Sequence, residues 1–268
     1  MSASTDPATP VRWARLTAPE IRAALAGPCV GLWPIGSTEQ HGPHLATGFD
    51  YLAAAAVVDR TAAALGPRAV VLPLLPVGCS AHWMGFGATL TIGQDTMVSI
   101  IGDVCRSASD AGVRDLVIVN GHAGNVGAGM AAVGGLSGLL CRVHFASYWD
   151  FMGDAAASVL TSDSGIGHAA EIETSIGLSL GDPEDPDHLA GLIRPDEIPG
   201  PGTPYLEPLG RTGVYRPVRV DPAGSSGVVG NPAAASRERG EKLFELAVAG
   251  LEAYCRSVID AQGIGGSR

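Results

Sequence analysis

Apolar, β-branched runs alternate with helical patterns along the first half of this chain. Four runs have the length and composition of buried strands, namely Cys29–Trp33, Ala69–Leu75, Leu116–Val119 and Val143–Ser147. Consecutive parallel strands need a crossover connection, which is usually a helix, and the crossover helices cover both faces of the sheet. The alternation therefore predicts a single-domain, three-layer α/β/α fold with a mostly parallel sheet.

Three helical segments lie between or after these strands, and a fourth lies near the end of the chain. Asp50–Leu65 is rich in alanine and ends at Gly66–Pro67, which is a helix stop signal. Gln94–Ala111 has its apolar residues at i, i+3 and i+4 spacing, so they form one stripe. A third helix is expected to start near Asn125. Pro232–Cys255 has the helical spacing of a segment that closes the core.

We expect residues 10–260 to form one domain, because a chain of 268 residues suits a single large α/β domain and shows no internal repeat. Residues 181–231 hold nearly half of the prolines and little periodicity, which predicts an irregular excursion. Residues 1–9 and 261–268 are expected to be flexible tails, with fraying from Arg256 onward.

The formal net charge of −10 comes from 17 basic and 27 acidic residues. An acidic chain repels phosphate, so we expect neither a nucleic-acid nor an anionic-membrane partner. No apolar run approaches the roughly 20 residues that a membrane span needs. The opening residues lack the features of a signal peptide, and the five cysteines are scattered without a C-x-x-C pair. These features predict reduced thiols and a cytoplasmic location.

Histidines concentrate in segments that follow a predicted strand or open a helix. Five of the seven do so: His41, His44, His82, His122 and His168. In open α/β sheets the ligand crevice lies beyond the carboxyl ends of the strands. Three separate strand-end loops therefore deliver histidine to the same edge of the predicted sheet, which is the strongest functional signal that the residues themselves provide.

The loop after the first strand, "GSTEQHGPHLATGFD", carries several ligand-type residues. Glu39 and His41 are two apart, and in extended backbone such residues point the same way, so both could reach one metal or two adjacent ones. Asp50 is either a further ligand or the N-cap of the next helix. His44 is better suited to a hydrogen bond beside the ligands. The alternative for this loop is a solvated turn.

The segment "LVIVNGHAGNVGAG" reads as strand, tight turn and helix. A glycine-rich dinucleotide loop is the alternative, but the glycines are spaced G-x-x-G-x-x-G and not G-x-G-x-x-G. His122 also stands where a pyrophosphate would need free backbone. An imidazole at a strand end fits a metal ligand better.

The segment "GIGHAAEIETSIGLSL" offers His168, Glu171 and Glu173. On a helix Glu173 lies about 200° round from Glu171, so both carboxylates can serve one centre only if the helix starts near Glu171. The alternative is an exposed acidic first turn, which the helix dipole favours. Ser37 and Ser80 lack the G-x-S-x-G elbow of a nucleophile, so serine hydrolysis has little support.

Four blocks together resemble the creatininase family of metal-dependent amidohydrolases. They are "PIGSTEQHGPHLATGFD", "SAHWMGFGATLTI", "VNGHAGN" and "GHAAEIETS", in the family's order over about residues 28–180. The resemblance implies a single α/β domain, usually in a homohexamer, with one or two divalent metals of zinc, manganese or iron(II). By the resemblance, Glu39, Asp50 and His122 would hold one metal, and Asp50 would bridge to a second metal held with His41.

Three departures from the family pattern bear on the metals and the substrate. Gly124 stands where creatininase carries a glutamate that holds the second metal, and we expect Glu171 to replace it. Ala46 and Phe49 replace the proline and threonine of "HLP-x-x-T-D", and Phe86–Thr89 reads F-G-A-T where the family reads F-P-G-T. These changes weaken the case for creatinine itself as the substrate.

We expect a metal-activated water to hydrolyse a C–N amide or lactam bond of a small molecule or short peptide. His168 would be a general acid–base or substrate contact, and Glu173 would orient groups or shuttle protons. The expected substrate contacts are His82, Trp83, Phe49 and Trp149. The alternatives are a lactone or C–C (cyclic ketone) hydrolase at the same site, a nucleotide-binding oxidoreductase, and a catalytically inactive structural relative.

Overall fold

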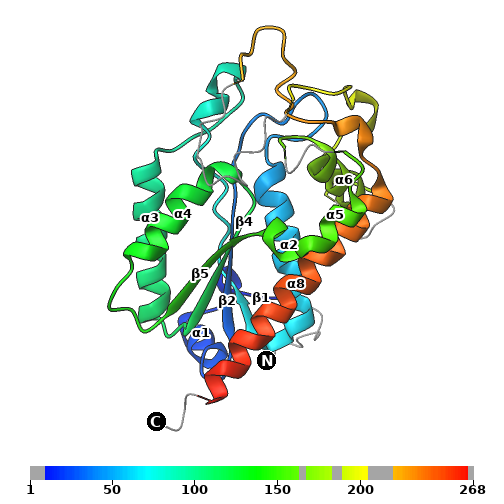
Figure 1. Ribbon diagram of the computed structural model, residues 1–268. Coiled ribbons are helices and arrows are strands. Elements are labelled where there is room, and N and C mark those ends of the chain that lie inside the picture. The colour runs from blue at the N-terminus through cyan, green and yellow to red at the C-terminus, as the bar shows by residue number, and fades with distance from the viewer. Residues whose placement is uncertain (1–9, 163–166, 183–188, 205–219, 265–268) are drawn as a thin grey trace.

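The protein has a five-stranded, fully parallel sheet in the order β1-β3-β2-β4-β5 (Figure 1). The computed structural model describes residues 10–162, 167–182, 189–204 and 220–264. The strands are β1 (Val11–Arg12), β2 (Val30–Ile35), β3 (Ala69–Val71), β4 (Asp115–Asn120) and β5 (Arg142–Ser147). The four predicted strands are confirmed. The sequence missed β1 because two residues carry too little pattern to detect.

Four of the described α-helices follow predicted segments, whereas those at Ala18–Ala24 and Ala156–Val159 were not predicted. The described α-helices are α1 (Ala18–Ala24), α2 (Phe49–Leu65), α3 (Gln94–Asp110), α4 (Val126–Gly135), α5 (Ala156–Val159), α6 (Glu171–Leu180) and α8 (Arg237–Ile264). Among them, no helix is both long and apolar enough to cross a membrane. All five cysteines are buried and free of disulfides.

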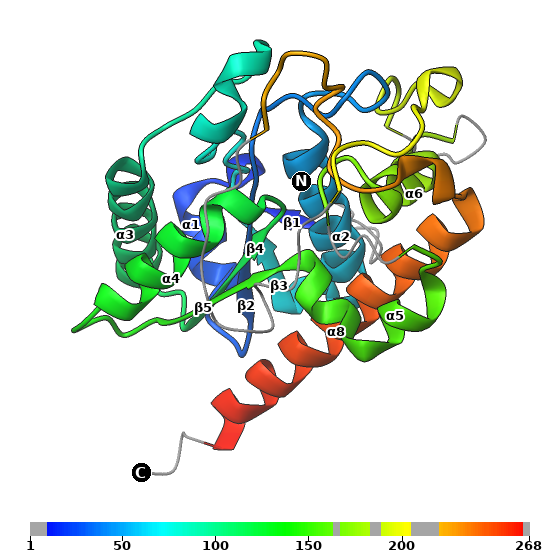
Figure 2. The same ribbon diagram turned by 45° about the horizontal axis from the view of Figure 1, so that its top comes forward.

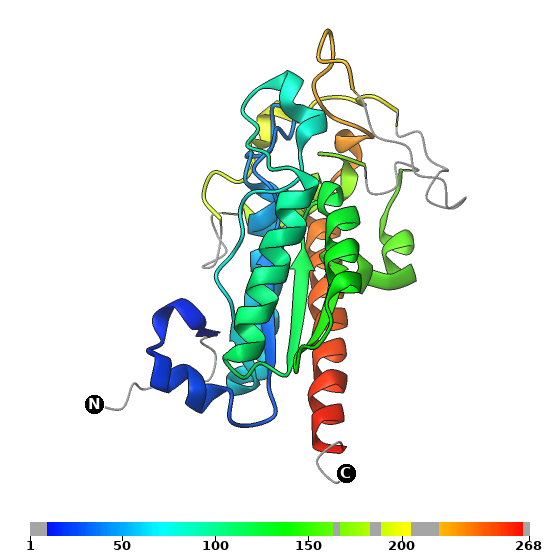
Figure 3. The same ribbon diagram turned by 90° about the vertical axis from the view of Figure 1, so that its left-hand side faces the viewer.

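Alternate residues of the central strands face two separate apolar cores, which confirms the three-layer architecture. Val117 and Val119 of β4 belong to the core beneath α2, α6 and α8. Leu116 and Ile118 belong to the core beneath α3 and α4. Figure 1 shows α3 and α4 on one side of the sheet and α8 on the other, and in Figure 3 the α3 and α4 layer faces the viewer. Both faces of the sheet are covered, as expected of parallel strands.

The connections from β2 and β4 leave toward opposite faces of the sheet. β2 leads into α2 on one face, whereas β4 leads into α4 on the other, although the two strands are hydrogen-bonded neighbours. Such a topological switch point opens a crevice beyond the carboxyl ends of the strands. The loops after β2 and β4, which carry most of the predicted ligands, therefore meet at this crevice.

A glycine follows each of these two strands because the first turn of α2 rests directly on them. A Cβ at Gly36 would lie 2.5 Å from the backbone nitrogen of Tyr51, and a Cβ at Gly121 would lie 2.1 Å from the carbonyl oxygen of Asp50. Only glycine permits such an approach. The contact brings the start of α2, and Asp50 with it, onto the switch point.

The described parts of the excursion at residues 181–231 are irregular, as predicted, but their end lies over the site. Residues 189–204 and 220–231 contain turns, one short 3₁₀ segment at Pro195–Glu197 and isolated bridges. Val229 forms an antiparallel bridge with His168 and a parallel one with Thr203. Figure 2, tilted forward, shows this orange segment meeting the loops at the strand ends.

The C-terminal helix does not fray at Arg256, so that expectation is wrong. α8 continues to Ile264, because Val258 and Ile259 are still buried against the core. Gln262 donates to the carbonyl of Cys29 and to a carboxylate oxygen of Asp115, and its own oxygen accepts from the Cys29 amide. These bonds close the helix onto the edge of the sheet opposite the site.

Replacing Gln262 with alanine should therefore destabilise the fold by about 1–3 kcal/mol in urea unfolding, because three hydrogen bonds are lost, one of them to a buried carboxylate. Asp260→Ala, at an exposed position, is the control and should change stability by less than about 0.5 kcal/mol. Equal stability of both variants would mean that the end of α8 is dispensable.

The stability that Gln262 contributes to the fold should also depend on pH. Burial opposes ionisation of Asp115, but the donors from Arg142, His144 and Gln262 outweigh it and hold the pKa of Asp115 below its usual value. A depressed carboxylate pKa stabilises the folded state above the unfolded value of about 4, and this stability is lost as the pH falls through the folded value. The difference in the free energy of unfolding between Gln262→Ala and wild type should therefore become smaller in acid.

Candidate metal centre

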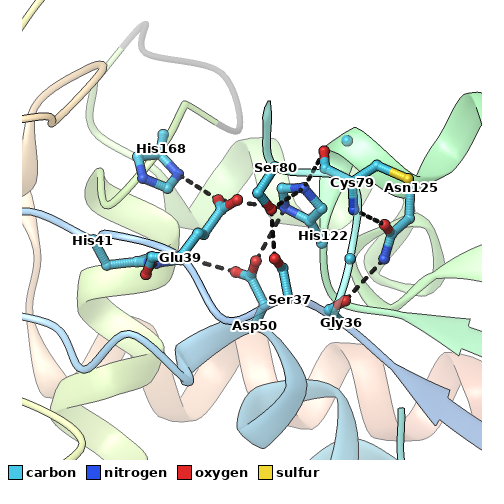
Figure 4. Close-up of polar contacts among 12 residues, drawn as sticks. Gly36, Ser37, Glu39, His41, Asp50, Cys79, Ser80, His122, Asn125 and His168 are labelled. Carbon is cyan, nitrogen blue, oxygen red and sulfur yellow. Dashed lines mark hydrogen bonds and ion pairs between the residues drawn. The ribbon is translucent and has the colours of Figure 1, made fainter. Parts of the chain in front are cut away.

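Six ionisable side chains from three loops and the first turns of α2 and α6 meet beyond the carboxyl ends of β2 and β4. They are Glu39, His41, Asp50, His122, His168 and Glu173, and none is more than 8% exposed. Five of them line a pocket of about 140 Å³, whereas His41 lies beneath it. Figure 4 shows five of the six gathered together, namely Glu39, His41, Asp50, His122 and His168. The predicted convergence is confirmed.

Asp50 lies between two imidazoles, with one carboxylate oxygen toward each. Its Oδ1 lies 2.9 Å from His41 Nε2, and its Oδ2 lies 3.0 Å from His122 Nδ1. The N-cap of α2 is Gly48, and no side chain caps the helix. The helix-cap alternative for Asp50 is therefore wrong, and its side chain belongs to the cluster.

A backbone carbonyl sets the orientation of each histidine in the cluster. His41 Nδ1 lies 3.1 Å from the Glu39 carbonyl, His122 Nε2 lies 3.2 Å from that of Cys79, and His168 Nε2 lies 2.8 Å from that of Gln40. A carbonyl can only accept, so each of these nitrogens carries the proton. In the neutral form, the other nitrogen of each ring then presents its lone pair to the carboxylates.

The charges of the cluster strongly perturb its pKa values. Burial disfavours protonation of His41, but the charge of Asp50, with those of Glu173 and Glu39, raises the pKa of His41 to about 10. Burial acts likewise on His122, yet Glu39 and Asp50 hold its pKa well above the usual value. Burial raises the pKa of Glu173 to about 7, although His41 opposes the shift. Three carboxylates in one buried site thus create a strong attraction for cations.

Several atoms of the cluster lack the partners that buried polar groups normally have. Within the described part of the chain, both carboxylate oxygens of Glu39, Nε2 of His41 and Oδ2 of Asp50 accept or donate no hydrogen bond of good geometry. Ligand-type atoms gather within 4.8 Å in three groups: Glu39–His41–His168, Glu39–His82–His122 and His41–Asp50–Glu173. Mixed carboxylate and imidazole donors fit zinc, manganese or iron(II), so a divalent ion would satisfy these atoms.

Glu171 is not part of the cluster, which contradicts its predicted role as a metal ligand. α6 does begin at Glu171, but its carboxylate accepts four hydrogen bonds, from the amides and hydroxyls of Thr161 and Ser162. Glu173 faces the cluster instead, with Oε2 3.9 Å from His41 Nε2 and 2.5 Å from the amide of Ala169. The rotation of about 200° between the two residues separates their carboxylates.

Gly124 has no room for a side chain. A Cβ there would lie 2.3 Å from the Cys79 carbonyl oxygen and 2.3 Å from His122 Nε2. The carbonyl that orients His122 thus occupies the space that a side chain at this position would need. Glu173 is the carboxylate that the structure brings beside His41 and Asp50.

Three of the four predicted substrate contacts line the pocket, namely His82, Trp83 and Trp149. Phe49 does not: it is fully buried in the core, and its ring lies 5.5 Å from that of His41. The structure therefore does not support a substrate contact for Phe49, whose apolar ring packs beneath the cluster. His44 donates to or accepts from Thr174 Oγ1 at 2.8 Å, which fits its predicted supporting role.

His168 is held in place by a network that the sequence analysis missed. Its ring stacks on buried Trp83 at a centroid distance of 4.2 Å, and its Nδ1 lies 3.5 Å from Glu39 Oε1. The Gln40 side chain donates to the Gly227 carbonyl and accepts from the Gly42 amide. Glutamine and glycine in loops carry no distinctive pattern, so this link between distant segments was invisible in the sequence.

Asn125 joins the loops that follow three strands. Its side-chain oxygen accepts from the amide of Cys79 at 2.9 Å, and its nitrogen donates to the carbonyl of Gly36 at 3.0 Å. Asn120, at the end of β4, accepts a further bond from it. Figure 4 shows these bonds beside the cluster. The only signal in the sequence was its place in "NGHAGN".

Ser80 completes an alignment that resembles a serine–histidine–aspartate triad. Its Oγ lies 3.2 Å from His122 Nε2 and 2.5 Å from Ser37 Oγ. Both hydroxyls are fully buried, and neither residue lines the pocket, so a substrate cannot reach them. The geometry supports the sequence-based view that serine is not the nucleophile.

Replacing Gly124 with alanine should displace either His122 or the Cys79 carbonyl. We expect at least about 10-fold weaker binding of Zn²⁺ in calorimetric titration, as for the loss of other ligand-orienting groups. Gly127→Ala is the matched control, because a Cβ there meets nothing within 4 Å and alanine favours the helix. Equal Zn²⁺ affinity of the two variants would show that the loop accommodates the methyl group.

Comparison with known proteins identifies the family. The profile of the family described as "Creatininase: Creatinine amidohydrolase" matches residues 14–255. The creatinine amidohydrolase of Pseudomonas putida is 32% identical over 254 residues, which cover 87% of this chain and 90% of that protein. The mycofactocin precursor peptide peptidase of Mycolicibacterium smegmatis is 34% identical over 223 residues, covering 82% and 81%.

Solved structures agree with this assignment. A structure described as "Creatininase Mn" superposes with a TM-score of 0.74 at 30% identity and covers 92% of this chain and 98% of the other. A mutant creatininase described as "Zn-Zn type" has a TM-score of 0.73 at 30% identity, with the same coverage. The fold, the order of the site loops and the full-length similarity together show that this chain belongs to the creatininase family of hydrolases.

Proposed function

We propose that this protein is a metal-dependent amidohydrolase that cleaves an amide or lactam C–N bond of a small molecule or short peptide. The observation that carries the proposal is Asp50, which directs one oxygen at His41 and the other at His122 in a buried cluster. Glu39, whose carboxylate oxygens accept no hydrogen bond from any described residue, lies 3.3 Å from His122 Nδ1. Related proteins are named for action on creatinine and on a precursor peptide, both of which contain C–N bonds of this kind.

One or two divalent ions, of zinc, manganese or iron(II), would bind at two adjacent positions. Glu39, Asp50 and His122 would hold one, and His41, Asp50 and Glu173 would hold the other, with Asp50 shared. Zinc and manganese are named for similar creatininase structures. When bound, such an ion polarises a carbonyl and lowers the pKa of a coordinated water from about 15.7 toward 7.

His168 is the residue best placed to move a proton. Its Nε2 proton is committed to the Gln40 carbonyl, so Nδ1 is the acceptor. In the neutral ring, Nδ1 carries the lone pair that faces the site. Nδ1 can therefore take a proton from the attacking water and return it to the leaving nitrogen. Trp83 holds the ring in this orientation by stacking.

The substrate would meet the pocket walls formed by His82, Trp83 and Trp149. A pocket of about 140 Å³ admits the reacting group and its nearest atoms, so the rest of a longer substrate would lie outside it. Aromatic walls exclude water and present flat apolar surfaces to a planar amide. A small lactam and the end of a short peptide both meet these requirements.

Two alternatives use the same residues or the same segments. A lactone or C–C (cyclic ketone) bond could be hydrolysed by the same nucleophile and general base. A nucleotide-binding oxidoreductase has less support, because Gly121 and Gly124 are needed for close packing against Asp50 and Cys79 and do not form a ligand cradle. We further propose a single domain over residues 10–260 and a cytoplasmic location and, from the resemblance, a homo-oligomer in the form of a hexamer.

Removing metal should abolish activity, and His122→Ala should prevent its recovery. After chelation, we expect the hydrolysis rate of the wild type to fall more than about 100-fold. The rate should recover when Zn²⁺, Mn²⁺ or Fe²⁺ is added. His144→Ala is the control, because His144 contacts Asp115 and Tyr254 far from the cluster. His122→Ala with wild-type metal content and wild-type rate would refute the site.

The bond that is cleaved can be identified from the products. We expect a panel of lactams, small amides and short peptides to yield a new primary or secondary amine, which a fluorogenic amine reagent detects. A lactone and a cyclic diketone serve as comparison substrates. If either of these two is hydrolysed and no member of the panel yields an amine, the proposed amide hydrolysis is wrong and the C–O or C–C alternative takes its place.

A further inference from the structure

His82 lies at the edge of the metal centre and has no assigned partner. It belongs to a short 3₁₀ segment, Ala81–Phe86, in the loop after β3. One of its ring nitrogens, an oxygen of Glu39 and a ring nitrogen of His122 all lie within 4.8 Å of one another. Two ligands of one zinc-like ion lie up to about 4.2 Å apart, since each bond is about 2.1 Å. A small side-chain rotation therefore brings His82 into the same coordination sphere.

The neighbouring residue keeps His82 in this place. Trp83 is buried, and its ring stacks on that of His168 with an interplanar angle of 23°. This anchor fastens the 3₁₀ segment to the cluster, so His82 cannot swing far from it. The ring of His82 runs nearly parallel to that of His122, at a centroid distance of 5.9 Å and an angle of 6°.

The imidazole of His82 is available for coordination. In the described part of the structure, neither of its ring nitrogens takes part in a hydrogen bond, and its contacts are with the rings of Trp83 and His122. Both carboxylate oxygens of nearby Glu39, which is 1% exposed, also lack hydrogen bonds. One shared cation would satisfy both residues.

We propose that His82 is an additional protein ligand to the metal at the Glu39–Asp50–His122 position. This inference rests on the proposed function, because it requires that a metal binds there. The ligand set of this position then contains two carboxylates and two imidazoles, which together neutralise a divalent ion. His82 is also the most exposed of the four, so this ligand faces the substrate pocket directly.

Cobalt(II) binding to the whole protein tests this role without reference to activity. Wild type and His82→Ala, both freed of metal, are titrated with Co²⁺ while heat and visible absorption are recorded. We expect His82→Ala to bind Co²⁺ at least about 10-fold more weakly, by analogy with lost ligand-supporting groups. The visible bands of the bound ion should also shift, because an imidazole is replaced by water. Equal thermal unfolding of the two metal-free proteins confirms that the variant folds.

The controls separate a failure of this inference from a failure of the proposed function. His144→Ala removes a histidine outside the cluster and should leave both affinity and spectrum unchanged. If His82→Ala has unchanged affinity and spectrum but a raised KM, then His82 contacts substrate and the inference is overturned, while the metal site stands. If wild type takes up no Co²⁺, Zn²⁺ or Mn²⁺, the proposed function falls and this inference falls with it.

Discussion

The direct contact between the first turn of α2 and the ends of β2 and β4 is the constraint on which the site depends. It exists because Gly36 and Gly121 present bare backbone to Tyr51 and Asp50. Asp50 is thereby placed over the one point in the sheet where neighbouring connections diverge. Every other member of the cluster is arranged about this carboxylate, since His41 and His122 approach it from opposite sides.

The glycines of "NGHAGN" have the same physical explanation. They looked like a phosphate-binding turn, but the crowding around Gly121 and Gly124 shows that they let three chain segments touch. Asn125 then fastens those segments with its side-chain amide, at Cys79 and Gly36. A rigid frame of this kind suits a metal site, because ligands must be held close together although their like charges repel.

Orientation by backbone carbonyls is a second common feature of the cluster. His41, His122 and His168 each donate one ring proton to a carbonyl, and these carbonyls belong to residues whose own positions the loops determine. The choice of ring nitrogen that faces the centre is therefore a property of the backbone and not of the side chains. This arrangement leaves the second ring nitrogen of each of the three histidines facing the carboxylates of the cluster.

Much of the fold and the site could be predicted from the sequence, because both depend on local pattern. The period of apolar residues indicated the strands and helices, and parallel strands direct their carboxyl ends to one edge. His41, His82 and His122 follow from that rule, because each stands in the loop after a strand. The parts that failed involve contacts between segments distant in sequence: Gln40 with Gly227, and Gln262 with Cys29 and Asp115.

The sequence by itself determined the layered α/β fold, the strand-end position of the ligands and the chemical types available for a metal. Only the tertiary structure decided which of two nearby carboxylates serves the centre. Glu171 and Glu173 are equivalent as residues, but the rotation of α6 turns Glu171 toward the hydroxyls and amides of Thr161 and Ser162. It likewise decided that Phe49 is core and that His82 lies beside Glu39. These outcomes depend on how separate elements pack, which no local pattern encodes.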